Sequence, residues 1–249
     1  MKIKLLCCFI ILSYNLCWGI WPDKNYLYTP NKFGFKFKTV KIRTADNILI
    51  NTWNIVPQKS NKNKVTIIMC GGDSGNMSYI LKQSMTLAYQ GYNVISFDYR
   101  GFGNSQSFKH DTTMLFYNEF LLDFEAVIKY AKKLYPNNRI GTLGFSMGGY
   151  FPLVTKVKLD FMIADSPLVS PSIFMNRLQR NEMQLPYNFR EPITKSIPQL
   201  YFLGTKDKRI IVDDIPNNFA ILYKGDHVQA DYILADKFYE IIDSFLSNL

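Results

Sequence analysis

Short apolar stretches recur along the chain, and amphipathic segments separate them. The apolar stretches predict strands that are buried on both faces, over residues 64–70, 93–98, 139–145, 159–164, 199–203 and 218–223. Apolar residues at helical spacing predict helices over residues 78–90, 118–134 and 231–246, with a further helical turn from Met147 onward. Residues 35–56 alternate in places around a polar turn at 44–47, which predicts a β-hairpin.

This order of elements predicts an α/β fold. Because strands alternate with helices, the connections cross over and produce a mostly parallel central sheet with helices on both faces. The N-terminal hairpin is expected to add antiparallel strands at one edge. In such sheets ligands bind beyond the carboxyl ends of the strands, so the residues directly after each strand are the candidates for chemistry.

Length and composition fit one large globular domain. The chain has 249 residues, of which 47% are hydrophobic, and its 14 Gly and 11 Pro exclude collagen-like and low-complexity architectures. It has two histidines, His110 and His227, and it contains no Cys-x-x-Cys, no His-x-x-x-His and no phosphate-binding glycine loop. We therefore expect neither a metal ion nor a cofactor.

The first 19 residues have the order of a secretory signal. Lys2 and Lys4 precede an apolar run over residues 5–12, and small residues follow it. We expect cleavage after Gly19, which leaves a single exported domain over residues 20–249, either periplasmic or secreted. An uncleaved N-terminal membrane anchor is the alternative, because apolar residues resume close to the expected cleavage point.

Removal of this signal changes the charge and the cysteine content. Loss of Lys2 and Lys4 lowers the formal net charge from +9 to +7, and Cys70 becomes the one remaining cysteine, so no internal disulfide can form. The remaining Lys and Arg are scattered, so we interpret them as solvated surface and expect no nucleic-acid partner. Peripheral association with an anionic membrane surface stays open, and the oligomeric state is not defined by the sequence.

A Gly-x-Ser-x-Gly motif lies between a predicted strand and a predicted helix. It reads Gly144-Phe145-Ser146-Met147-Gly148. At such a strand–turn–helix junction the turn is so tight that glycines must flank the serine, and the serine hydroxyl is lifted above the edge of the sheet. Ser146 is therefore the candidate nucleophile. The alternative is a glycine-rich helix start that serves packing or anion binding.

A serine nucleophile needs a base within hydrogen-bond reach, and histidine is the usual one because it titrates near neutral pH. His227 follows the last predicted strand and precedes the final helix, which is the position that the sheet geometry requires. His110 lies in a polar loop before a helix, and we expect it at the surface. His227 is therefore the candidate base.

The base in turn needs an acid that fixes its tautomer and stabilises the imidazolium. Asp207 follows a predicted strand directly, so it lies at the same edge of the sheet, whereas Asp213 and Asp214 are competitors a few residues later. The chain order is then Ser146, Asp207, His227, one of the orders known for such triads. A helix cap or a plain loop carboxylate is the alternative role for Asp207.

Over residues 35–249 the sequence resembles the α/β-hydrolase family. Besides the glycine–serine motif, the resemblance rests on Asp98–Ser105, Gly204–Asp207 and Gly225–His227. It implies Ser146 as the nucleophile, His227 as general base and then acid, and Asp207 as the orienting acid. The sequence is most similar to compact single-domain acylhydrolases, including depalmitoylase-like and serine aminopeptidase-like members.

The oxyanion hole of such an enzyme is expected to use two backbone N–H groups. One belongs to Met147, and the other to the loop after the strand at 64–70, where position implies Asp73. This loop departs from the family pattern, because a carboxylate at that place would oppose the developing negative charge. We therefore expect the Asp73 side chain to point away from the hole if the enzyme is efficient.

The stretch from residue 166 to 198 is too short for a cap domain and predicts a small lid. Its apolar residues have two equally favoured interpretations: they line an acyl pocket, or they pack in the core. These residues are Phe174, Met175, Leu178, Met183, Leu185, Tyr187 and Phe189. The favoured hypothesis is a cofactor-independent serine hydrolase that cleaves an ester, thioester or amide of a small-molecule or lipid acyl substrate through an acyl-enzyme. A catalytically inactive hydrolase-fold binding protein and a serine peptidase are the alternatives.

Overall fold

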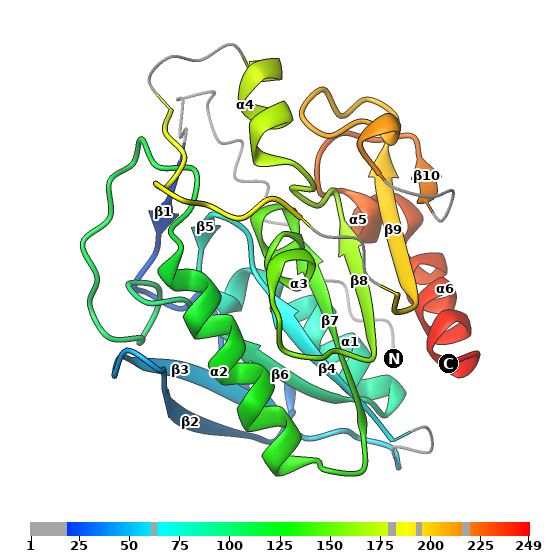
Figure 1. Cartoon of the computed structure of the whole chain (residues 1–249). Helices are drawn as coiled ribbons and strands as arrows, with labels where there is room; N and C mark the ends of the chain where they lie inside the picture. The colour runs from blue at the N-terminus through cyan, green and yellow to red at the C-terminus, as the bar shows by residue number, and fades with distance from the viewer. Residues whose placement is uncertain (1–18, 61–63, 179–182, 193–195, 216–219) are drawn as a thin grey trace.

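The computed structural model describes residues 19–60, 64–178, 183–192, 196–215 and 220–249. Within them an eight-stranded sheet has the order β10-β9-β8-β7-β4-β6-β3-β2 (Figure 1). Its strands are β2 Phe37–Arg43, β3 Leu49–Ile55, β4 Val65–Cys70, β6 Asn93–Phe97, β7 Arg139–Phe145, β8 Phe161–Asp165, β9 Gln199–Gly204 and β10 Ala220–Tyr223. Strands β4 and β6–β10 run parallel, whereas β2 and β3 form the antiparallel hairpin, with β2 at the edge. The predicted fold class and the position of the hairpin are confirmed.

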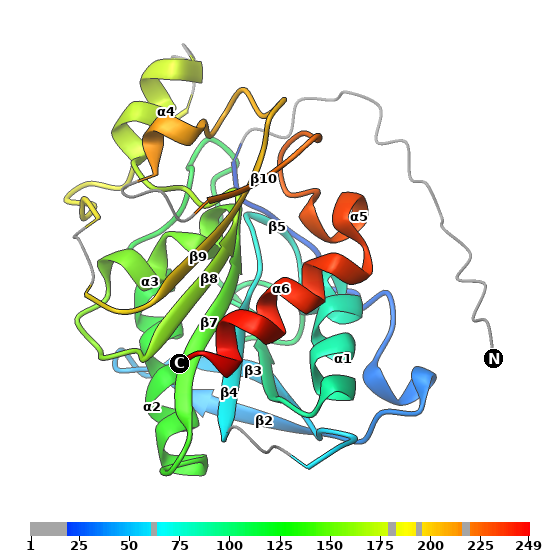
Figure 2. The ribbon, with the colours of Figure 1, turned by 90° about the vertical axis from the view of Figure 1, so that its right-hand side faces the viewer.

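The central strands are buried along their whole length because both faces of the sheet are covered. Alternate residues of β4 enter different cores: Ile67 and Met69 pack on one side, and Ile68 and Cys70 on the other. Helices α2 (Glu119–Leu134) and α3 (Phe151–Val154) cover the core that contains Ile68 and Cys70. Helices α1 (Leu81–Gln90) and α6 (Asp236–Ser247) cover the core that contains Ile67 and Met69. Figure 2 shows these two helical layers on opposite sides of the sheet.

The C-terminal helix differs from its prediction. Instead of one helix over 231–246, the chain forms α5 (Ala230–Leu234) and α6, separated by Ala235. Ala235 has φ 48° and ψ −123°, which lies outside the helical region, so the backbone turns between the two helices. The apolar spacing runs through the break, and for that reason the pattern alone predicts one helix.

A second, two-stranded sheet was not predicted. Strand β1 (Trp21–Pro22) pairs in parallel with β5 (Ser74–Gly75), and the backbone N–H of Trp21 donates to the carbonyl of Asp73 at 2.9 Å. Strands of two residues have no detectable periodicity, which is why the sequence shows no sign of them. The pairing attaches the N-terminal segment to the loop that follows β4.

A buried carboxyl anchors this N-terminal segment further. Asp98, which follows β6, accepts hydrogen bonds from the Tyr26 hydroxyl and from the backbone N–H of Met77, the latter at 2.8 Å. Asp98 is 1% exposed, and this burial raises its pKa to about 6 although both hydrogen bonds oppose the rise. Asp98 therefore links its own segment, which follows β6, to the segments that contain Tyr26 and Met77.

The predicted signal lies outside the described residues except for Gly19, so it stays a prediction. Within the described ranges no helix combines the length and the apolar character needed to cross a bilayer. The predicted lid contains α4 (Pro171–Leu178), which lies beyond the carboxyl ends of β8 and β9 (Figure 1). Its function as a lid stays a prediction.

Candidate active site

Ser146 occupies a tight turn between β7 and the 3-10 turn η3 (Ser146–Gly149). Its φ is +50°, a conformation that non-glycine residues adopt rarely and that occurs at strained functional turns. The flanking glycines allow the close packing: a Cβ on Gly144 would lie 2.4 Å from the carbonyl oxygen of Gly148, and one on Gly148 would lie 2.3 Å from that of Cys70. This is the local geometry of a nucleophile elbow.

The structure brings the three predicted side chains together. His227 Nε2 lies 2.9 Å from Ser146 Oγ, and His227 Nδ1 lies 2.7 Å from Asp207 Oδ2. With Nδ1–H donating to the carboxylate, Nε2 is left as the acceptor for the serine hydroxyl. The His227 side chain is 13% exposed and that of Asp207 is fully buried, so the chain of hydrogen bonds opens to solvent at its serine end.

Asp207 is held as a carboxylate. Burial alone would raise its pKa, but the hydrogen bond and charge of His227 and the backbone N–H groups of Arg209 and Ile210 outweigh burial and lower it. Both backbone groups donate to Oδ1, at 2.8 and 3.2 Å, which leaves Oδ2 for His227. The carboxylate can therefore orient the imidazole and stabilise a positive charge on it.

The competing carboxylates lie elsewhere. Asp214 accepts hydrogen bonds from the Arg177 guanidinium at 2.6 and 2.8 Å and from the backbone N–H of Ile211. Asp213 is exposed. Neither is among the hydrogen-bond partners of His227 in the part of the chain that the structure describes.

The expected surface position of His110 is wrong. Its ring is half-buried among Phe102, Phe108, Tyr117 and Phe120, and its Nε2 lies 3.2 Å from the carbonyl oxygen of Arg100. Burial lowers its pKa. The sequence neighbours of His110 are polar and give no sign of the aromatic cluster that covers the ring. Because the ring lies in this cluster and bonds a backbone carbonyl, its role is structural rather than catalytic.

The predicted oxyanion hole has two backbone segments close to Ser146, but a carboxyl also lies nearby. The Met147 N–H lies in the first turn of η3, where helical N–H groups lack an intrahelical acceptor. The loop after β4 passes the nucleophile closely, since a Cβ on Gly72 would lie 3.9 Å from Ser146 Cβ. The carboxyl of Asp73 lies within electrostatic range of His227. Desolvation raises the pKa of Asp73, and the outward orientation of its side chain stays a prediction.

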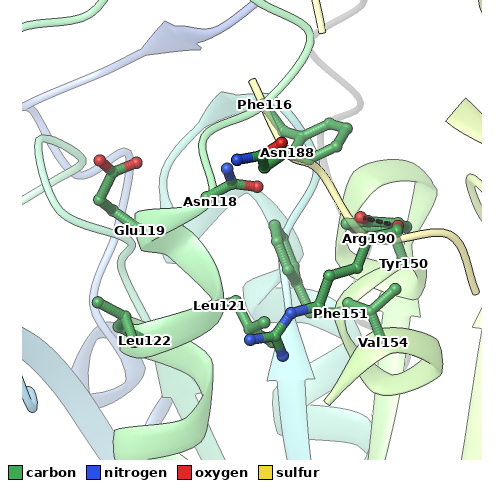
Figure 3. Close-up of a pocket in the computed structure, with 10 residues that line it drawn as sticks. All are labelled: Phe116, Asn118, Glu119, Leu121, Leu122, Tyr150, Phe151, Val154, Asn188 and Arg190. Carbon is green, nitrogen blue, oxygen red and sulfur yellow. Dashed lines mark hydrogen bonds between the residues drawn. The ribbon is translucent and has the colours of Figure 1, made fainter. Parts of the chain in front are cut away.

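Between α2 and α3 the protein has a hollow of about 310 Å³. Its floor is largely apolar, and Figure 3 shows the Arg190 side chain reaching across it toward Leu121. The lining residues are Phe116, Asn118, Glu119, Leu121, Leu122, Tyr150, Phe151, Val154, Asn188 and Arg190. Ser146 is not one of them, so this hollow does not contain the candidate nucleophile.

The apolar residues of the predicted lid contribute little to this hollow. Most of them pack against the core on the α2 side, namely Phe174, Met175, Leu178, Met183, Leu185 and Phe189. Tyr187 is 89% exposed. The core-packing interpretation of the stretch is therefore the better one for the residues described.

Two further polar residues near His227 belong to no motif. Asp165 ends the buried strand β8, and Tyr223 ends β10. The only signal for Asp165 in the sequence is a charged residue that closes an apolar run at the carboxyl edge of the sheet, and Tyr223 gives none. Among the residues that the structure describes, no group of three or more His, Cys, Asp or Glu side chains is arranged to bind a metal ion.

The fold and the elbow define a class of protein. A mostly parallel sheet with helices on both faces and a serine at a strand–helix turn is the architecture of the α/β hydrolases. The family model described as "Serine aminopeptidase, S33" matches residues 61–245, most of the chain. The chain belongs to this hydrolase family, and the resemblance seen in the sequence is confirmed.

Individual relatives are distant. An uncharacterized membrane protein of Saccharomyces cerevisiae is 23% identical, over 90% of this chain and 84% of its own. The structure of the esterase Pf2001 from Pyrococcus furiosus has a TM-score of 0.73 and 25% identity, over 92% of this chain and 98% of that chain. The acylaminoacyl peptidase of Pyrococcus horikoshii shares the fold, with a TM-score of 0.62 and 15% identity, over 86% and 41%.

Proposed function

We propose that the protein is a serine hydrolase that uses Ser146, His227 and Asp207 to cleave an ester or thioester through an acyl-enzyme. The observation that carries the proposal is the continuous chain of hydrogen bonds from the Ser146 hydroxyl through the imidazole to the buried Asp207 carboxylate, at 2.9 and 2.7 Å. Such a chain activates a hydroxyl that is otherwise a weak nucleophile.

The proposed reaction has two halves. His227 Nε2 takes the proton of Ser146 as Oγ attacks the acyl carbon, and the oxyanion forms next to the Met147 N–H. The imidazolium then gives that proton to the leaving alcohol or thiol, and the acyl group remains on Oγ. A water molecule, deprotonated by the same nitrogen, hydrolyses the acyl-enzyme and restores the serine hydroxyl. Asp207 stays ionised throughout.

The preference for esters is supported by the likeness to the Pyrococcus furiosus esterase. A peptidase remains the nearest rival, because the same three side chains also cleave amides and a peptidase shares the fold. Turnover of acyl p-nitrophenyl esters compared with aminoacyl p-nitroanilides on the full-length protein separates the two. We expect esters to be cleaved faster, and a preference for the anilides would assign a peptidase.

The inactive alternative is favoured by one observation: Asp73, in the loop expected to supply the second N–H of the oxyanion hole, places its carboxyl within electrostatic range of His227. Labelling by a fluorophosphonate probe distinguishes an active serine hydrolase from an inactive binding protein. We expect the wild type and Ser244→Ala, which alters an exposed serine on α6, to be labelled and active. Ser146→Ala should lose both labelling and ester turnover. Folded wild-type protein without labelling would assign a binding protein, and turnover by Ser146→Ala would exclude the proposed nucleophile.

A further inference from the structure

The segment directly after His227 is held by an unusual set of hydrogen bonds. Three consecutive backbone N–H groups, those of Val228, Gln229 and Ala230, each donate to a different side chain. The acceptors are Ser166 Oγ at 3.1 Å, the Tyr223 hydroxyl at 2.9 Å and Asp165 Oδ2 at 3.0 Å. On the other side of the histidine, the Tyr223 hydroxyl also contacts the carbonyl oxygen of Asp226 at 3.0 Å.

The three accepting side chains are bonded to one another. Asp165 Oδ1 lies 3.0 Å from the Tyr223 hydroxyl and 3.2 Å from the Ser166 hydroxyl. All three residues are buried, with Asp165 1%, Ser166 0% and Tyr223 3% exposed. Asp165 and Tyr223 end different strands of the sheet, so the cluster rests on rigid elements. We refer to Asp165, Ser166 and Tyr223 as the histidine-loop anchor.

The backbone at this place needs such an anchor. Val228 has φ +54°, a conformation that is costly for a β-branched residue and persists only when the surroundings hold it. Val228 directly follows His227, so relaxation of this backbone would rotate the imidazole away from its two partners. A displacement of about 1 Å at a catalytic group is enough to reduce a rate substantially.

Asp165 is distinct from the orienting acid. Both of its oxygens are used by the anchor and by the Ala230 N–H, and Nδ1 of His227 already donates to Asp207 at 2.7 Å. Asp165 therefore does not bond the imidazole, although it lies within electrostatic range of it. Its contacts are with the backbone that carries the histidine.

We propose that Asp165, together with Tyr223 and Ser166, is a positioning residue that holds the His227 loop so that the imidazole bridges Ser146 and Asp207. This inference rests on the proposed function, because it assigns His227 to catalysis. Loss of an anchor hydroxyl should lower kcat and leave KM nearly unchanged, since the buried anchor holds the backbone of His227 and its loss would misalign the proton transfer.

Tyr223→Phe tests this with a matched control, Tyr201→Phe. Tyr201 is equally buried on the neighbouring strand β9, and its hydroxyl contacts Gln199 and Met162 rather than the histidine loop. We expect Tyr223→Phe to lower kcat for ester hydrolysis about tenfold with KM within twofold, and Tyr201→Phe to retain both. Asp165→Asn, which preserves shape, should resemble Tyr223→Phe if it folds.

A second measurement does not depend on turnover. The chain has only two histidines, so the NMR ring signals of His227 can be assigned directly. They should shift or broaden in Tyr223→Phe and remain unchanged in Tyr201→Phe. Equal kcat and equal His227 signals in the two variants would overturn the anchor. If the wild type hydrolyses no ester, the proposed function fails, and the NMR comparison still decides whether Tyr223 positions His227.

Discussion

Replacing Asp207 by Asn should reverse the hydrogen-bond polarity of the candidate triad. Oδ1 of Asp207 accepts from the backbone N–H groups of Arg209 and Ile210, so the amide oxygen of an asparagine would take that place. The amide NH₂ would then face His227 and donate to Nδ1. This selects the tautomer with the proton on Nε2, which cannot accept the proton of Ser146.

The expected decrease in kcat follows from the loss of the correct imidazole tautomer. An imidazole in the wrong tautomer cannot act as the base, and a defect of this kind lowers kcat about ten-thousandfold in serine hydrolases, which corresponds to about 5 kcal/mol of transition-state stabilisation. The fold should persist, because the two backbone hydrogen bonds to Oδ1 are retained in the variant.

The assay is steady-state hydrolysis of a short p-nitrophenyl ester, with circular dichroism to verify the fold. Asp213→Asn is the matched control, because Asp213 is exposed on the same connection and has no hydrogen bond to His227 among the described residues. We expect Asp213→Asn to keep wild-type kcat. A kcat of Asp207→Asn within tenfold of wild type, or a collapse in Asp213→Asn, would refute the assignment of the acid.

Three further outcomes are expected. Gly148→Ala should abolish ester turnover, because its Cβ would lie 2.3 Å from the carbonyl oxygen of Cys70, whereas Gly71→Ala, with open space at its Cβ, should retain activity in the same assay. Asp73→Ala should raise kcat about tenfold at alkaline pH by removing a negative charge near the oxyanion, and a lower kcat would contradict this role. Asp98 has a folded pKa of about 6 against an ordinary 3.8, so the stability that its neutral form contributes is lost as pH rises through about 6. In urea titrations the stability of Asp98→Asn relative to wild type should therefore improve by about 2 kcal/mol from pH 4 to 7.5, and a constant difference would argue against the raised pKa.

The sequence pattern predicted most strands and helices because each depends on the residues within its own segment. A strand buried on both faces requires a continuous apolar run, as in β4, and the helix α2 requires apolar residues on one side, so both are visible in the sequence. Gly91, which ends α1 at φ 107°, is a stop signal of the same kind. The break at Ala235 and the pairing of β1 with β5 depend on tertiary contacts, and the pattern contains no trace of them.

The candidate site divides in the same way. Ser146, Asp207 and His227 were predicted because each follows a strand, and parallel strands end at one edge. The desolvation that raises the pKa of Asp73 depends on the conformation of the loop after β4, which no periodicity encodes. The anchoring role of Tyr223 depends on contacts between strands that are 58 residues apart in sequence, as in its hydrogen bond to Asp165.

The pairing of β1 with β5 connects the N-terminal segment to the candidate active site. Trp21 is 58% exposed, and its N–H is bonded to the carbonyl of Asp73, in the loop that passes next to Ser146. This short sheet therefore couples the position of the segment around Trp21 to the loop that passes the candidate nucleophile.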